Sequence, residues 1–231
     1  MRRRAEFRER FVREAWTMTK RFGTDAVQNI ELGEIAFMDQ AVAAGYVEDP
    51  QRLVLAALVG GLGCRTFFEI GTNRGRTTWT VARSNPKLTL HTLDVPIGQT
   101  PDATAFALHE VDRMVFRDTS CGEAFRDTPE GERITQLWGD SASFDFSPYA
   151  DGIDCVYIDG SHSYEYARSD TASALAMLSP YGAIVWDDYG NFPGVYQAVL
   201  EFAGLQDHPV YHLLGTRYAV YSRTPLVAPV G

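Results

Sequence analysis

Residues 67–78 read Phe-Phe-Glu-Ile-Gly-Thr-Asn-Arg-Gly-Arg-Thr-Thr. The stretch begins as an apolar strand, turns between Gly71 and Gly75, and continues as a helix, an arrangement that places a ligand at the carboxyl end of a sheet. Asp94 ends the next predicted strand about 20 residues further on, where an acidic side chain can accept hydrogen bonds from both ribose hydroxyls. Together these features predict a nucleoside-binding site on an α/β sheet.

The spacing of the glycines indicates which nucleoside is bound. A dinucleotide site needs G-x-G-x-x-G, because its second glycine lets the backbone approach a pyrophosphate, but Asn73 stands at that position. The pattern E-x-G-x-x-x-G, from Glu69 to Gly75, instead suits a nucleoside without phosphates, such as S-adenosylmethionine. The sulfonium and amino groups of this ligand are cationic, so Glu69 is a favourable neighbour. The alternative is that Gly71 and Gly75 only serve a tight turn.

Outward from this stretch, apolar runs of strand length alternate with helical segments, which is typical of β-α-β units and a parallel sheet. Two closing strands joined by Gly215 and Thr216 predict an antiparallel hairpin. We therefore expect an α/β fold that is Rossmann-like and doubly wound, with a mostly parallel seven-stranded sheet and a C-terminal antiparallel hairpin. The expected strands are Thr66–Ile70, Thr89–Asp94, Ile134–Trp138, Ile153–Asp159, Ala183–Asp187, Val210–Leu213 and Arg217–Tyr221.

Extra N-terminal helices are expected before the sheet. Residues 1–22 have the apolar spacing of an amphipathic helix, which would pack against the domain or a partner subunit, or cover the substrate. Further helices are expected over 33–45 and 50–61, the last with an early proline and a Gly-Gly stop. Residues 1–62 are thus predicted to form a helical cap, and residues 63–231 the nucleoside-binding domain.

The composition limits the partners of the chain, which has 231 residues and a formal net charge of −9. This acidic balance argues against nucleic acid, whose recognition needs a basic surface. No stretch reaches the ~18 consecutive apolar residues of a transmembrane helix, so no membrane partner is expected. Three widely spaced cysteines match neither a zinc site nor a disulfide framework and indicate a reduced, cytoplasmic protein. A small-molecule partner fits best, and a homo-oligomer stays open.

The combination of these motifs resembles the class I S-adenosylmethionine-dependent methyltransferases. In that family an acidic-glycine loop, an acidic end of the second strand and an Asp after the third strand surround the cofactor. The third feature is present in Leu-Trp-Gly-Asp-Ser over residues 137–141. The resemblance implies that Asp140 accepts from the adenine amino group with Ser141 alongside, and that Thr77 contacts the carboxylate of the cofactor. The alternative is that Asp140 only caps a helix.

Acidic residues also follow two later strands. Asp159 and His162 come at the end of one predicted strand, and Asp187 and Asp188 at the end of the next. If these strands are neighbours, three carboxylates converge at the ligand edge, and their repulsion requires bound protons or a cation. Oxygen ligands favour Mg²⁺ or Mn²⁺ over zinc. The alternative is that Asp159 and His162 are ordinary turn residues.

This second spacing resembles the metal-dependent O-methyltransferases of the catechol type and of the macrolide-sugar type, the latter represented by macrocin O-methyltransferase. The catechol type has Asp, a Lys base and Asp-Asn, whereas the sugar type has His and an acidic pair in the latter places. The chain is nearer to the sugar type, which puts a catechol substrate in doubt. A metal held by Asp159, Asp187 and Asp188 would lower the pKa of a substrate hydroxyl. His162 would then act as the general base.

The sequence therefore predicts an S-adenosylmethionine-dependent O-methyltransferase acting on a hydroxyl of a small molecule, such as a sugar, diol or phenol of natural-product metabolism. Three alternatives stay open. The first is a metal-independent methyltransferase, which would use the same cofactor and His162 but no cation. A non-catalytic nucleoside-binding protein is disfavoured by the acidic residues and His162, and a nicotinamide-dependent reductase is disfavoured by Asn73 and by the final hairpin.

Overall fold

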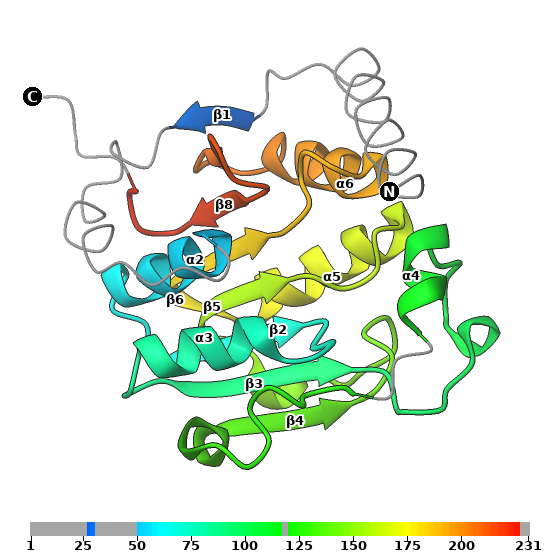
Figure 1. Ribbon diagram of the computed structural model, residues 1–231. Coiled ribbons are helices and arrows are strands. Elements are labelled where there is room, and N and C mark those ends of the chain that lie inside the picture. Colours follow the sequence, from blue (N-terminus) through cyan, green and yellow to red (C-terminus); the bar gives the residue numbers. More distant parts are fainter. Residues whose placement is uncertain (1–26, 31–49, 117–119, 227–231) are drawn as a thin grey trace, which may run out of the picture.

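The computed structural model describes residues 27–30, 50–116 and 120–226, in which helices cover both faces of one sheet (Figure 1). Eight strands of the described residues form the sheet in the order β1-β7-β8-β6-β5-β2-β3-β4. They are β1 (Val27–Ile30), β2 (Thr66–Ile70), β3 (Thr89–Asp94), β4 (Ile134–Trp138), β5 (Ile153–Ile158), β6 (Leu178–Trp186), β7 (Val210–Leu213) and β8 (Ala219–Ser222).

The pairing of the strands confirms the predicted fold class. Strands β2 to β6 pair in parallel, and β8 joins them by an antiparallel contact with β6 while forming an antiparallel hairpin with β7. All seven predicted strands are present, although β6 begins five residues earlier than the predicted Ala183. Strand β1 was not predicted. Its four residues, Val-Gln-Asn-Ile, have no alternating apolar pattern, and they form a strand by pairing with the edge of β7.

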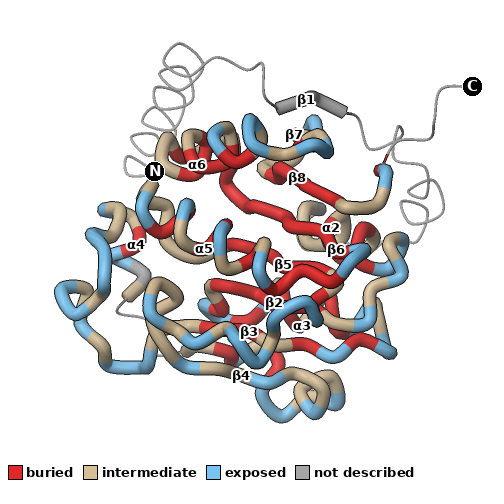
Figure 2. The backbone as a smooth tube through the Cα atoms, turned by 180° about the vertical axis from the view of Figure 1, so that it is seen from behind, coloured by how far each residue is buried: buried red, intermediate tan, exposed pale blue. Residues whose placement is uncertain are grey.

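Helices on both faces bury the sheet. Helices α2 (Pro50–Gly61) and α3 (Arg76–Ser84) lie on one face, and α5 (Tyr164–Met177) and α6 (Pro193–Ala203) on the other (Figure 1). Because side chains alternate along a strand, Phe67 packs with α2 and α3, whereas Phe68 packs with α5 and α6. Figure 2 shows the consequence, a continuous buried zone along the central strands. Burial of both faces explains why these strands read as nearly unbroken apolar runs.

The predicted N-terminal helices have different outcomes. The helix over residues 50–61 is confirmed as α2, whose Leu55 is fully buried and shares a core cluster with residues of β2 and α3. The helices predicted over 1–22 and 33–45 lie outside the described residues, and the division of the chain after residue 62 stays a prediction. None of the described helices is both long enough and apolar enough to cross a membrane.

The order of the strands determines where a ligand can bind. From β2 the chain proceeds outward to β3 and β4, then returns to the other side of β2 to form β5 and β6. In open α/β sheets the crevice at such a reversal lies at the carboxyl ends of the strands. Shorter elements border this edge or join the strands: α4 (Glu110–Val115), η4 (Pro101–Ala103), η5 (Pro129–Arg133) and η6 (Ser147–Tyr149).

Gly71 lies where the loop after β2 passes the ends of both neighbouring strands. Its φ of 100° is in the left-handed region that favours glycine. Its N–H donates to the carbonyl of Leu93 at 2.8 Å, and a Cβ at this position would lie 2.0 Å from the carbonyl oxygen of Asp159. Only glycine therefore lets the loop over residues 71–75, called the cofactor loop below, pack directly against the end of β5.

We expect Gly71→Ala to lower the free energy of unfolding by about 1–3 kcal/mol, because the added methyl group collides with backbone that has no room to move. Gly215→Ala is the matched control. Gly215 also has a positive φ, of 81°, but no described atom lies within 4 Å of its added Cβ. Urea unfolding of both variants separates the collision from the strain of the backbone angle, and equal losses would contradict the role of the close approach.

Candidate active site

A cavity of about 640 Å³ opens at the carboxyl ends of β2, β3, β4, β5 and β6. Its volume lies within the range of small-molecule sites. Among the residues predicted from the sequence, those that line it are Gly71, Asn73, Asp94, Asp140, Ser141, Asp159, His162 and Asp188. The fold thus brings most of the predicted cofactor residues and most of the predicted acidic residues to a single space.

Asp94 ties the cofactor loop to the end of β3. One carboxylate oxygen accepts the backbone N–H of Asn73 and the other accepts that of Val95, both at 2.7 Å. Asn73 has a φ of 46°, a conformation that asparagine adopts more readily than most residues. Burial raises the pKa of Asp94 above its ordinary value, although these hydrogen bonds oppose the shift. Its position at the cavity wall is the one that the ribose prediction requires.

Asp140 borders the same cavity from the end of β4 and is held by several donors. Its carboxylate accepts the N–H of Ala105 at 2.7 Å, the N–H of Ala142 at 3.0 Å and the hydroxyl of Tyr166 at 2.8 Å. The contact with Ala142 has the local geometry of a turn or cap, whereas the other two connect distant segments. Asp140 therefore organises the wall of the cavity, with Ser141 beside it.

Three predicted cofactor residues do not line the cavity: Glu69, Gly75 and Thr77. Glu69 is buried and accepts hydrogen bonds from the hydroxyls of Thr78 and Thr92, and burial raises its pKa to about 8. Gly75 begins α3 with a φ of 75°, and a Cβ there would lie 2.5 Å from the ring of Phe125. Glu69 thus links α3 to β3, Gly75 joins the cofactor loop to α3, and Thr77 lies in the first turn of α3.

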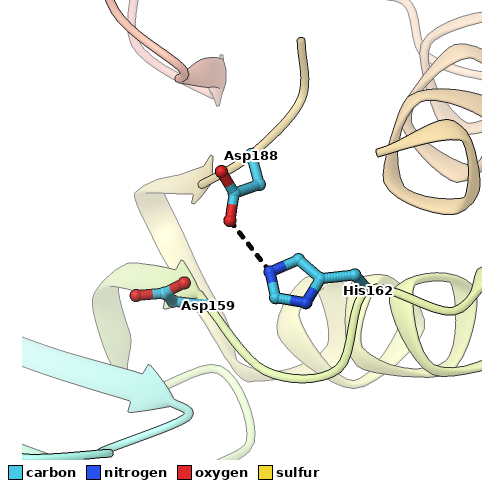
Figure 3. A group of neighbouring side chains, drawn as sticks. All are labelled: Asp159, His162 and Asp188. Carbon is cyan, nitrogen blue, oxygen red and sulfur yellow. Dashed lines mark hydrogen bonds and ion pairs between the residues drawn. The ribbon is translucent and has the colours of Figure 1, made fainter. Parts of the chain in front are cut away.

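A group of three side chains, Asp159, His162 and Asp188, forms what we call the acidic cluster (Figure 3). One possible ligand atom from each lies within 4.8 Å of the others, and His162 Nε2 is 2.8 Å from Asp188 Oδ2. Asp159 follows β5 directly and Asp188 follows β6, while His162 lies in the loop before α5. Because β5 and β6 pair in parallel, their ends bring these residues together, as predicted.

Asp187 is not part of the acidic cluster. Its carboxylate accepts from the hydroxyl of Tyr157 at 2.8 Å and from Arg217, whose Nη2 and Nε lie at 2.7 and 3.0 Å. Successive side chains at a strand end point in different directions, and Asp188 has a left-handed φ of 56° that turns the chain further. The two adjacent aspartates that the sequence grouped as ligands thus differ in their partners, although Arg217 contacts both.

Among the residues of the site that the sequence analysis missed, two carry charged groups, Asp112 and Arg217. Asp112, on α4, contacts His162 from 50 residues away in the sequence. Arg217, just before β8, lines the cavity and lies 3.4 Å from Asp188 through its Nε atom, in addition to its contacts with Asp187. Neither residue belongs to a motif, so no local signal could have identified them.

The charges of the site are strongly coupled. Burial raises the pKa of Asp159 well above its ordinary value, and the neighbouring carboxylates raise it further. Burial disfavours a charge on His162, but hydrogen bonds to Asp112 and Asp188 outweigh this and raise its pKa to about 10. The region contains two basic side chains, those of His162 and Arg217. Four carboxylates lie around them, those of Asp112, Asp159, Asp187 and Asp188. The carboxylates outnumber the basic side chains, and a bound divalent cation would favour ionisation of Asp159.

The atoms of the acidic cluster fit a hard divalent cation. The carboxylate oxygens of Asp159 and Asp188 are ligands of the kind that suit Mg²⁺ or Mn²⁺, and the cluster contains no thiol. The separation of 4.8 Å or less between ligand atoms is small enough for one ion to contact more than one of them. The residues present are therefore compatible with the predicted metal.

Comparison with known families decides the class of the protein. Residues 68–189, more than half of the chain, match the family described as "Methyltransferase domain". The chain belongs to this methyltransferase family. The resemblance to class I S-adenosylmethionine-dependent methyltransferases is thereby confirmed, and the matched segment contains both the cofactor loop and the acidic cluster. No curated protein sequence matches the chain significantly.

Solved structures share the fold of this methyltransferase. The calicheamicin methyltransferase CalS11 aligns with a TM-score of 0.57 and 18% identity, covering 91% of both chains. TomG of Streptomyces achromogenes, an O-methyltransferase involved in tomaymycin synthesis and solved with S-adenosylmethionine, gives 0.54 and 18%, covering 92% of this chain and 96% of its own. A Nostoc punctiforme protein classed as an O-methyltransferase gives 0.52 and 15%, covering 74% of this chain but 54% of its own length. At these identities the likeness concerns the fold.

Proposed function

We propose that this methyltransferase transfers a methyl group from S-adenosylmethionine to a hydroxyl oxygen of a small molecule, assisted by a divalent cation. The observation that carries the proposal is that the cofactor loop and the acidic cluster line the same cavity. Methyl transfer to oxygen requires a nucleoside cofactor and a hydroxyl-activating group side by side, because most of the acceleration comes from holding the reacting atoms close.

On the cofactor side, the proposed roles follow the positions of the side chains. Asp94 accepts hydrogen bonds from the ribose hydroxyls, and Asp140 and Ser141 border the adenine. Gly71 keeps the loop close enough to β5 for both halves of the site to adjoin. S-adenosylmethionine would supply the methyl group.

On the acceptor side, Asp159 and Asp188 are the proposed anionic ligands of the cation. A bound Mg²⁺ or Mn²⁺ would lower the pKa of a substrate hydroxyl. His162 is the proposed base, and the nitrogen that takes up the proton is Nε2, since Nδ1 is paired with Asp112. Because its two carboxylate neighbours raise the pKa of His162, Nε2 must first lose both its contact with Asp188 and its proton, which engagement of Asp188 by a cation would favour. We propose that Asp187, the third ligand expected from the sequence, instead holds Arg217.

The proposed acceptor is a sugar, a diol or a phenol of natural-product metabolism. The pattern of His162 followed by an acidic pair supports the sugar type over the catechol type. The names of two similar structures, a calicheamicin methyltransferase and an O-methyltransferase of tomaymycin synthesis, support the same direction. A second candidate is a metal-independent methyltransferase, favoured by the ion pairs of Arg217, which already compensate part of the acidic charge.

The purified protein is expected to convert S-adenosylmethionine to S-adenosylhomocysteine when supplied with a panel of sugars and diols together with Mg²⁺. Chelation should abolish turnover without unfolding the protein, because the core does not include the acidic cluster. Added Mg²⁺ or Mn²⁺ should restore it. Full activity in protein shown to be metal-free by elemental analysis would contradict the metal role and leave His162 as the base of a metal-independent enzyme.

A further inference from the structure

Asp112 makes a set of contacts that no motif predicts. Its Oδ1 pairs with Nδ1 of the His162 ring, and its Oδ2 accepts the backbone N–H of His162 at 2.9 Å and the hydroxyl of Ser161 at 2.8 Å. The residue is 8% exposed, so these contacts are protected from water. One carboxylate on α4 thus holds both the backbone and the ring of the residue that faces the acidic cluster.

Aromatic packing restricts the same imidazole from its faces and edges. The ring of Phe192 lies tilted by 30° against the His162 ring with a centroid distance of 3.9 Å. His109, the residue before α4, contacts both rings, His162 at 6.4 Å and Phe192 at 5.0 Å, in edge-on orientations. With its plane restricted by packing and Nδ1 held by Asp112, the His162 ring has one orientation that directs Nε2 toward Asp188.

We propose that Asp112 is a positioning residue, which fixes the orientation of the His162 ring so that Nε2 is presented to the acidic cluster. The physical reason is that an ionised carboxylate only accepts hydrogen bonds, so the nitrogen facing Asp112 must carry the proton. With Nδ1 held in this way, the other ring nitrogen, Nε2, is the one presented to Asp188. Carboxylates that hold a histidine in this way are typical partners of metal-binding and catalytic histidines. The inference rests on the proposed function of His162 and assigns its missing partner.

The structure also indicates that α4 itself belongs to the site. Figure 1 places this short helix at the carboxyl edge of the sheet, beside the start of α5. On its exposed side, α4 makes an ion pair that does not involve the cavity: Arg113 pairs with the exposed carboxylate of Asp102 at 2.7 Å. Asp102 therefore offers a matched control: it is an aspartate that anchors α4 without touching His162.

The test compares Asp112→Ala, Asp112→Asn and the control Asp102→Asn in the full chain. Asp112→Ala is expected to lower kcat by about 10–100-fold and to leave the KM for S-adenosylmethionine nearly unchanged. This is the usual loss when a site histidine loses the carboxylate that holds its other ring nitrogen. Asp112→Asn should recover part of the loss, because its amide oxygen still accepts from Nδ1. Asp102→Asn should retain full kcat.

Two measurements do not depend on activity. NMR of ring-labelled histidine in the cation-free protein should show an Nδ1 proton of His162 protected from exchange with water, and this protection should be lost in Asp112→Ala. Calorimetric titration with Mn²⁺ should show weaker binding in the same variant. An unchanged His162 signal and a kcat equal to that of Asp102→Asn would overturn the proposal. Absence of methyl transfer by the unmodified protein would instead count against the proposed function, while the NMR result still decides the role of Asp112.

Discussion

Asp188→Asn is expected to weaken Mn²⁺ or Mg²⁺ binding roughly 100-fold or more. Loss of a residue that only hydrogen-bonds to a metal ligand typically lowers metal affinity by about 10–100-fold, and this change removes an anionic ligand itself. Asparagine is the appropriate replacement because Asp188 has a φ of 56°, which asparagine tolerates. The Asn191 amide, at 2.6 Å, and Arg217 Nε, at 3.4 Å, both contact the same carboxylate oxygen, Oδ1. Isothermal titration with Mn²⁺ measures the loss directly, and methyl transfer should fall in parallel.

Asp187→Asn is the matched control for this prediction, because it changes the adjacent aspartate in the same way. Its expected effect is on the free energy of unfolding, since Arg217 and Tyr157 would lose a charged partner in a buried position. Cation affinity should change much less than in Asp188→Asn. Equal losses of affinity in the two variants would show that Asp187 also binds the ion, as the sequence pattern suggested.

Asp94→Ala is expected to weaken S-adenosylmethionine binding by roughly 10–100-fold. The estimate corresponds to 1.5–3 kcal/mol for hydrogen bonds to a charged acceptor, which the two ribose hydroxyls would lose. The same change releases the backbone N–H of Asn73, so the cofactor loop would also be less well positioned. Calorimetry with S-adenosylmethionine in the absence of acceptor isolates this effect from catalysis.

Asp154→Ala controls for the structural part of the Asp94 result. Asp154 also accepts two backbone N–H groups, those of Arg65 and Thr66, but at the amino-terminal end of β2, outside the cavity. Its loss should reduce stability and leave cofactor affinity unchanged. If the Asp94 and Asp154 variants bind the cofactor equally well, the ribose assignment is wrong.

The carboxyl ends of the strands, where the ligand is expected to bind, were predictable because the residue patterns that mark them are local in the sequence. An apolar run followed by Gly71 and a helical segment predicts a strand, a turn and a helix from neighbours in the chain alone. The same holds for the strands that end at Asp94 and Asp159. Strand β1 shows the limit of this reasoning, since its four residues carry no pattern and form a strand only where β7 offers free backbone groups.

Within the site, the sequence alone determined which residue types reach the carboxyl edge, because in a parallel sheet every strand ends at the same side. It placed there Asp159, His162, Asp187 and Asp188. Only the tertiary structure decided which partners they contact. Arg217 pairs with Asp187 across 30 residues of sequence, and Asp112 contacts His162 across 50. Such contacts depend on how separate elements pack and on which buried charges find partners, and no local pattern of residues encodes that choice.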